Sequence, residues 1–288
     1  MIDLHSHTNF SDGTDTPAQL VAKAVETRLE ALAITDHDNF MGYDHALPLA
    51  ASAGLELICG IELSTRVEGL AAFKGRSVHL LGYFLGDGPS QEFRTWLLEL
   101  QENRRKRNRA LIAKLQSLGL EITLEEVQEI GGFMTGRPHF ATLLVRKGYV
   151  ASIPEAFSVY LADAAKAHVE REEPNLSEGI RRIREAGGLT SLAHPIRFGK
   201  NKIEDVERVI LRHREDGLEA IEVYHSDHSP EDAAAFLALA QRHGFGVTGG
   251  SDYHGENKPG IELGRGRNGN LSIPKSLLNT MREAAKPS

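Results

Sequence analysis

The distribution of apolar and polar residues predicts different structures for the two ends of the chain and for its middle. Near both ends, short apolar runs such as 32–34 and 56–62 have the length of buried strands. Between these runs lie stretches of helical periodicity, for example 16–25, which opens with a Thr–Pro–Ala–Gln capping box and continues as an apolar stripe. This alternation predicts a mostly parallel sheet covered by helices.

Seven strands are predicted in this way, and predicted helices separate most of them. The strands are the first residues as far as His7, followed by 32–34, 56–62, 77–84, 189–193, 218–224 and 245–249. The helices between them are predicted at about 16–25, 43–53, 176–186, 203–215 and 230–243.

Side chains that can bind metal lie in or directly after nearly every predicted strand. In the first strand, alternation places His5 and His7 on one face, and Asp12 follows in a turn that Gly13 helps to make. Later strands carry or deliver His37, Glu62, His79, His194, His225, Asp252 and His254. Ligands from so many strands meet only if the strands surround a common axis, since an open sheet gathers its ligands at one crevice. We therefore predict an α/β protein with a seven-stranded barrel.

The middle of the chain lacks strand signals. Helices are predicted at about 91–118, after Thr123, and at 138–147 and 153–161. We therefore expect 87–166 to be a helical subdomain inserted over the mouth of the barrel, and 1–86 with 167–288 to form the barrel itself.

Composition narrows the classes of protein and the compartment. A formal net charge of −7 argues against a surface devoted to nucleic acid, although a local basic patch remains compatible with it. Cys59 is the single cysteine, so no intramolecular disulfide can form, and its apolar surroundings indicate a buried thiol. No apolar run approaches the ~18 residues that a membrane span needs, and no signal peptide is apparent. We expect a cytoplasmic protein without an obligate protein partner.

The ordered set of motifs resembles the polymerase and histidinol phosphatase (PHP) family of the amidohydrolase superfamily. The motifs are His5-Ser6-His7, Asp12, Thr35-Asp36-His37, Glu62, His79, Ala193-His194-Pro195 and Ser251-Asp252-Tyr253-His254. The resemblance implies a distorted (β/α)7 barrel that holds two or three divalent ions. It implies that a first ion is bound by His5, His7, Glu62 and Asp252. Glu62 then bridges to a second ion on His79 and His194, and Asp12, His37 and His254 bind a third.

The donor set agrees with this resemblance on chemical grounds. Mixed imidazole and carboxylate ligation suits manganese, iron or zinc, and manganese is the ion we expect. Such ions activate water and neutralise a phosphoryl group, which predicts phosphate ester hydrolysis by a hydroxide that bridges the metals. Glu62 and Asp252 are the predicted catalytic residues together with His225, which could donate a proton, bind phosphate or simply be packed in the core. Asp36 is expected to orient a ligand or its loop.

Cations outside the metal set indicate a phosphorylated substrate. Arg137 opens a predicted helix within Arg-Pro-His, and Arg197 lies just after His194; with His139 and Lys166 they are the predicted phosphate-binding residues. The Arg-Pro-His segment and the insertion resemble the TrpH-like PHP subgroup, which implies action on 3′,5′-nucleoside bisphosphates or on short RNA from its 5′ end. A basic run at 104–109 could contact RNA or be the solvated face of a helix.

Other functions remain open at this point. Histidinol phosphate or another small phosphate ester is an alternative substrate. Amide or lactone hydrolysis, which the same superfamily supports, is a second enzyme class, although the arginines argue against it. A non-catalytic module that keeps metal only for structure is a third. The sequence leaves the identity of the metal and the size of the substrate undecided.

Overall fold

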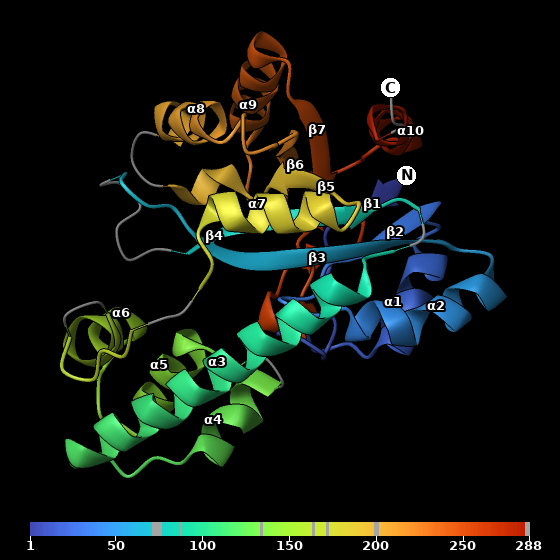
Figure 1. Cartoon of the computed structure of the whole chain (residues 1–288). Coiled ribbons are helices and arrows are strands. Elements are labelled where there is room, and N and C mark those ends of the chain that lie inside the picture. The colour runs from blue at the N-terminus through green and yellow to red at the C-terminus, as the bar shows by residue number, and fades with distance from the viewer. Residues whose placement is uncertain are drawn as a thin grey trace. The chain divides into compact units, whose positions relative to one another are not determined.

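The computed structural model describes residues 1–70, 77–86, 88–132, 135–162, 165–170, 173–198 and 202–285 (Figure 1). The chain divides into two compact units. The first consists of Met1–Arg94 and Pro174–Ser288, and the second of Thr95–Glu173. Residue 87, where we expected the insertion to begin, lies outside the described residues.

The first unit is built on one seven-stranded sheet whose spatial order is the order of the chain. Its strands are β1 (Ile2–Asp3), β2 (Ala31–Ile34), β3 (Glu56–Arg66), β4 (Ser77–Phe84), β5 (Leu189–Leu192), β6 (Ala220–His225) and β7 (Gly246–Gly250). Leu4 N donates to Gly249 O at 3.3 Å, and Ser6 forms a bridge with Tyr253, so the first and last strands approach each other. The sheet is therefore a nearly closed barrel, and the predicted seven-stranded fold is confirmed.

Strand β4 departs from the parallel arrangement. It is antiparallel to β3, from Cys59 opposite Phe84 to Arg66 opposite Ser77, and also antiparallel to β5, whereas the other strand pairs are parallel. Residues 67–76 alone separate β3 from β4, which is too few for the helical crossover that a parallel pair needs. Strand β3 continues four residues beyond its predicted end at Glu62, because β4 pairs along its whole length.

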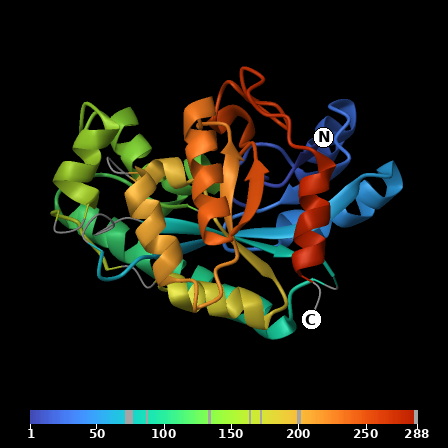
Figure 2. The same ribbon diagram turned by 90° about the horizontal axis from the view of Figure 1, so that it is seen from above.

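Helices surround this sheet. They are α1 (Pro17–Glu26), α2 (Met41–Ala53), α7 (Leu176–Glu185), α8 (Lys202–Arg212), α9 (Pro230–His243) and α10 (Lys275–Ala284). The predicted capping box of α1 is present, with Gln19 N bonded to Thr16 and the Gln19 side chain returning to Thr16 N. Figure 2 shows α9 and α10 on either side of β7. The pattern did not predict α10 or the small hairpin of β8 (Ile261–Glu262) and β9 (Gly266–Arg267).

The second unit is helical and has an apolar core of its own. It contains most of α3 (Gln91–Ser117), followed by α4 (Leu124–Gly131), α5 (Arg137–Arg146) and α6 (Ile153–Ala156). The stretch predicted as a helix at 153–161 is α6 continued by one π-helical turn, Phe157–Leu161. Its buried core includes Leu115, Val127, Phe140 and Leu144. Among the described residues, no helix combines the length and the apolar character that crossing a bilayer requires.

Candidate metal centre

The predicted metal ligands are all in the first unit, and the barrel strands bring most of them together. His5 and His7 directly follow β1, His37 follows β2, Glu62 and His79 lie within β3 and β4, and His194 and Asp252 follow β5 and β7. The side chains form three groups whose ligand atoms lie within 4.8 Å of one another. These groups are His5, His7, Glu62 and Asp252; His37, Glu62 and His79; and His7, Asp12, His37 and His254.

Glu62 occupies the centre of this arrangement. Its Oε1 lies 2.7 Å from Nδ1 of His79 and 2.7 Å from Nε2 of His194. Its Oε2 lies 3.0 Å from Nε2 of His7 and 3.2 Å from Nε2 of His5. The two oxygens thus face different histidine pairs, with His37 Nδ1 also 3.5 Å from Oε2, which is the geometry of a carboxylate that can bridge two cations.

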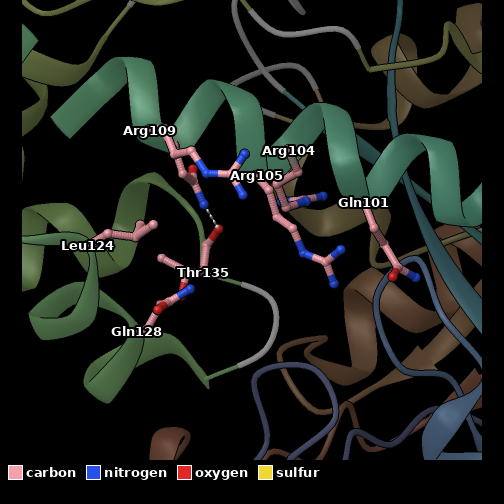
Figure 3. A pocket seen from close by; sticks show the side chains of 8 residues that line it. Gln101, Arg104, Arg105, Arg109, Leu124, Gln128 and Thr135 are labelled. Atoms are coloured by element: carbon pink, nitrogen blue, oxygen red, sulfur yellow. Dashed lines mark hydrogen bonds between the residues drawn. The ribbon is translucent and has the colours of Figure 1, made fainter. Parts of the chain in front are cut away.

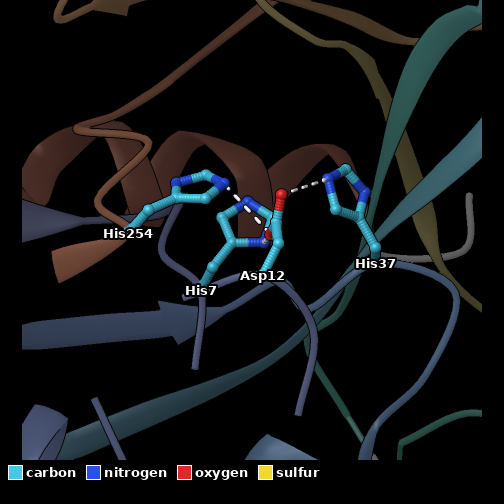
Figure 4. A group of neighbouring side chains, drawn as sticks. All are labelled: His7, Asp12, His37 and His254. Atoms are coloured by element: carbon cyan, nitrogen blue, oxygen red, sulfur yellow. Dashed lines mark ion pairs between the residues drawn. The ribbon is translucent and has the colours of Figure 1, made fainter. Parts of the chain in front are cut away.

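A second carboxylate, Asp12, organises the neighbouring group (Figure 4). Asp12 Oδ1 lies 3.1 Å from Nε2 of His254 and 3.5 Å from Nδ1 of His7, and Oδ2 lies 3.7 Å from Nε2 of His37. Figure 4 shows the three imidazoles turned toward this one carboxylate. His7 therefore belongs to two groups and links the Asp12 group to Glu62.

Unsatisfied polar atoms test whether this set fits metal ions. Four buried atoms in the groups have no hydrogen-bond partner among the described residues: His7 Nε2, Asp12 Oδ1, His37 Nδ1 and Asp252 Oδ1. A buried polar atom without a partner is costly and rare in folded proteins. All four are nitrogen or oxygen atoms that divalent transition metals bind. The residues present therefore fit the metal ions that the sequence led us to expect.

Two buried carboxylates hold the predicted ligands in place, and the sequence analysis did not identify them. Glu222 in β6 lies 2.7 Å from Nδ1 of His5 and accepts a 2.6 Å hydrogen bond from His194 N. Asp3 in β1 accepts hydrogen bonds from Ser251 N at 2.9 Å and Gly264 N at 2.7 Å, and so fixes the loop that carries Asp252. The available signal was a single acidic residue between apolar neighbours inside a strand.

Asp36 has the orienting role expected of it. It accepts hydrogen bonds from Thr8 N at 2.7 Å, Thr8 Oγ1 at 2.6 Å and Ser11 Oγ at 2.6 Å. These bonds fix the loop between His7 and Asp12. Gly42 packs against this carboxylate so closely that an added Cβ would come within 1.9 Å of Asp36 Oδ2.

The backbone at two candidate ligands is strained. His194 and Asp252 have φ angles of 27° and 54°, in the left-handed region that residues other than glycine seldom adopt. Such conformations persist where the surrounding structure enforces them, and they concentrate at functional sites. Here the hydrogen bonds to Glu222 and Asp3 supply that enforcement.

The electrostatics of the metal-free chain keep the central carboxylate, Glu62, ionised. Burial alone would raise the pKa of Glu62, but His79, His37 and His5 hold it well below its usual value. Burial likewise opposes protonation of His7, yet the neighbouring carboxylates of Asp252, Glu62 and Asp12 raise its pKa to about 9. Burial lowers the pKa of His37 to about 4. His7 therefore carries a proton that a metal ion must displace.

Two cations pair with the second oxygen of Asp252, and a third pairs with the neighbouring Asp227. Arg197 Nη2 lies 2.8 Å from Asp252 Oδ2 and 2.9 Å from Asp227 Oδ2, and Lys258 Nζ lies 2.6 Å from the same Asp252 oxygen. Arg267 reaches Asp227 at 3.2 Å. The sequence identified Arg197 but neither Lys258 nor Arg267, because both follow β7 in a segment without regular periodicity.

His225 is buried beside the cluster, and both of its ring nitrogens are engaged. Nδ1 accepts a hydrogen bond from Asp227 N at 3.0 Å, so Nε2 carries the proton and donates it to Asp252 Oδ2 at 3.2 Å. This pairing makes His225 a support for Asp252. Its predicted part in catalysis stays a prediction.

The remaining predicted phosphate-binding residues lie in the second unit. Arg137 Nη1 donates to Leu161 O at 3.1 Å, and His139 Nδ1 accepts from Gly136 N at 2.9 Å as part of the cap of α5. Lys166 lies over the Tyr160 ring at 5.9 Å. These contacts are within the unit, and the predicted role in holding phosphate stays a prediction.

The chain is similar to a family model and to several known proteins. Residues 3–149 match the family model of the PHP domain. The chain is 34% identical to the 5′-3′ exoribonuclease Rnm of Escherichia coli, over 91% of this chain and 88% of that protein. It is 31% identical to a 3′,5′-nucleoside bisphosphate phosphatase of Chromobacterium violaceum, over 91% and 90% of the two chains. A solved structure described as a metal-dependent phosphoesterase from Bifidobacterium adolescentis covers 100% of this chain and 96% of its own, with a TM-score of 0.73 and 30% identity.

Proposed function

The chain belongs to the PHP-domain family and is a metal-dependent phosphoesterase, and from this premise we propose that its substrates are nucleotides. The proposed reaction is hydrolysis of a phosphate ester in a 3′,5′-nucleoside bisphosphate or in short RNA. Two relatives that match about nine-tenths of the chain are named for these substrates, which supports the proposal. The observation that carries it is the placement of Arg197 and Lys258 on the same carboxylate, Asp252, that faces the metal ligands.

We assign two or three divalent ions to the cluster, and manganese is the ion we expect. His5, His7, Glu62 and Asp252 would hold the first ion. Glu62 and His79 would hold the second, together with His194. Asp12, His37 and His254 would hold the third. Bound there, the ions would supply Lewis acidity that activates water and neutralises charge on a phosphoryl oxygen.

The protein groups would position the reactants. Glu62, ionised and surrounded by five imidazoles, would keep the ligands of the first two ions at a common centre. The two oxygens of Asp252 have different neighbours. Oδ1 faces His5 and His7 at 3.4 and 3.5 Å, and Oδ2 pairs with the cations. Because the supporting bonds already exist, little reorganisation is needed when substrate binds.

Arg197 and Lys258 are suited to bind a second phosphate of the substrate. Each is held beside the cluster by a carboxylate, and a phosphate group can take over part of that pairing. A guanidinium bound to phosphate through two N–H groups is directional as well as strong. A nucleoside bisphosphate or an oligonucleotide offers such a second phosphate, whereas a simple phosphate monoester does not.

The cluster of Ser177, His213 and Asp216 gives no support to a competing hydrolase chemistry. Ser177 Oγ and Asp216 Oδ2 both approach the same nitrogen of His213, Nδ1, at 3.2 and 2.7 Å. A catalytic triad requires the serine and the acid on opposite ring nitrogens. The cluster is therefore a structural hydrogen-bond network.

A substrate screen tests the proposal. The full chain, supplied with manganese, would be assayed for phosphate release from adenosine 3′,5′-bisphosphate, histidinol phosphate and an aryl phosphate, and for release of mononucleotides from a short oligoribonucleotide. We expect kcat/KM to be highest for one of the two nucleotide substrates. Faster turnover of histidinol phosphate or of the aryl phosphate would contradict the nucleotide assignment.

A further inference from the structure

A small basic pocket lies within the second unit, between α3 and α4 (Figure 3). It encloses about 70 Å³. One face of α3 supplies Gln101, Arg104, Arg105, Asn108 and Arg109, and the other side is formed by Leu124, Gln128 and Thr135. No residue of this pocket belongs to the metal centre or to the cations beside it.

The charged residues that line this pocket are all positive. Among the eight described residues that line it, three are arginines and none is a carboxylate. Helical spacing explains the grouping, because positions 101, 104, 105 and 108 recur on one side of a helix. Arg105 and Arg109 both pair with Glu102, at 3.6 and 3.5 Å. This arrangement can accept an anionic ligand.

Asn108 provides a second and independent indication of a ligand. The residue is 5% exposed, and its Nδ2 donates to Thr135 O at 2.8 Å, which fixes the orientation of the amide. Its Oδ1 is buried and has no hydrogen-bond partner among the described residues. A buried acceptor of this kind is uncommon in native proteins and is suited to a ligand that donates a hydrogen bond.

We propose that this pocket binds one phosphate group of an oligoribonucleotide, with the attached ribose and base at its rim, and this inference rests on the proposed function. The arginines take the phosphodiester oxygens, and Asn108 Oδ1 accepts a hydrogen bond from the ribose 2′-hydroxyl or from a base amino group. Leu124 provides an apolar surface, and a guanidinium plane can stack on a base. The helical unit thereby contributes substrate affinity through residues that take no part in the chemistry.

Equilibrium binding tests the proposal without turnover. The probe is a fluorescein-labelled adenylate oligoribonucleotide of about five nucleotides, titrated with the full chain in EDTA and read by anisotropy. The variants are the triple change Arg104→Ala, Arg105→Ala and Arg109→Ala, and Lys106→Ala as the matched control. Lys106 is exposed on the same helix and does not line the pocket.

We expect the triple variant to weaken binding at least about ten-fold, because each charge-assisted hydrogen bond is worth about that factor. The slope of log K against log salt should fall by roughly 0.7 for each phosphate contact that is lost. Lys106→Ala should change the dissociation constant less than about two-fold. Equal binding by the wild type and the triple variant, or equal loss in the Lys106 control, would overturn the proposal.

Asn108→Leu separates the two possible donors. Loss of affinity for the ribonucleotide probe but not for its deoxy counterpart would identify the 2′-hydroxyl, and equal loss for both would identify the base. No loss for either probe would overturn the role of Asn108. Circular dichroism of each variant checks the helical fold.

Phosphate release from adenosine 3′,5′-bisphosphate, measured in parallel with manganese, keeps this test distinct from the proposed function. Normal release together with binding that does not depend on the arginines rejects the pocket alone. No release from any nucleotide together with binding that does depend on them rejects the proposed reaction and leaves the pocket.

Discussion

The two units use charge in opposite ways. In the barrel unit, Glu62 and Asp252 are 1% exposed, and each lies among fixed nitrogen groups. In the helical unit, Arg105 and Arg109 are 47% and 60% exposed, and both pair with Glu102. The first arrangement is rigid and desolvated, and the second is open to solvent and to exchange of ions.

This difference has a physical consequence for each unit. Buried charges are weakly screened, so the metal centre should depend little on ionic strength, whereas contacts made by exposed arginines weaken as salt rises. The difference also assigns two requirements of an enzyme, stabilisation of the transition state and capture of substrate, to different units. A preorganised site stabilises the transition state, and adaptable surface charge collects a polyanionic substrate. Removing charges from each unit in turn tests this division.

Loss of Glu62 should have the largest effect. Glu62→Ala removes the carboxylate that faces both histidine pairs, so we expect kcat to fall more than about a thousand-fold, ~4 kcal/mol of barrier. Circular dichroism should show a largely intact fold, because the apolar core is built from other side chains. Glu219→Gln, which alters a carboxylate of the same unit that pairs with Arg184, is the control. A variant that keeps more than about a tenth of the wild-type kcat would remove Glu62 from the proposed role.

The next effect concerns Arg197. Arg197→Ala should lower kcat/KM for a nucleoside bisphosphate about ten- to a hundred-fold, since a charge-assisted hydrogen bond contributes ~1.5–3 kcal/mol. It should barely affect an aryl phosphate, which has one phosphate to bind. Arg184→Ala, which removes an arginine paired with Glu219, is the matched control. Equal losses on both substrates would place Arg197 at the phosphate that reacts.

A smaller effect is expected for Glu222, which touches ligands rather than metal. Glu222→Gln keeps the shape of the side chain but weakens its hold on His5 Nδ1, so manganese affinity should fall about ten-fold. Saturating manganese should restore most of kcat, because the ligands themselves remain. Titration of the metal-free protein with manganese, read by activity and by calorimetry, checks both statements. An unchanged affinity would show that Glu222 is not needed to orient His5.

The smallest effect tests whether water reaches the buried interior of the barrel unit. Burial raises the pKa of the Cys59 thiol to about 12, from an ordinary value near 9. Because the folded pKa is the higher one, this stability is present below pH 9 and is lost as the pH rises toward 12. At pH 10 the wild type should have lost about 1.4 kcal/mol more unfolding free energy, relative to pH 7, than Cys59→Ala. Equal losses from urea unfolding curves would mean that the thiol is accessible to water in the folded state.

The proximity of the candidate ligands could be predicted from the sequence for a simple reason. His5, His7 and Asp252 stand at strand ends, and a barrel brings strand ends together whatever the loops do. Position along the chain therefore determined proximity in space. The predicted barrel depended on the same argument.

Other features depend on contacts that no local pattern records. Glu222 and Asp3 occupy strand positions where periodicity predicts only which face a side chain takes, and the partner is more than two hundred residues away in sequence. Lys258 and Arg267 follow β7 in turns and a short hairpin, and their placement comes from tertiary structure. Helix α10 was missed because its buried residues, Leu278 and Met281, are stabilised by packing on the barrel core.

The central claim is that one cluster around Glu62 holds more than one metal ion. The most direct measurement is elemental analysis of the full chain, purified without chelator, supplemented with manganese and then desalted. We expect two or three transition-metal ions per chain, and fewer in Glu62→Ala, because the bridging ligand is lost. At most one ion per wild-type chain, or the same number in the wild type and in Glu62→Ala, would contradict the account.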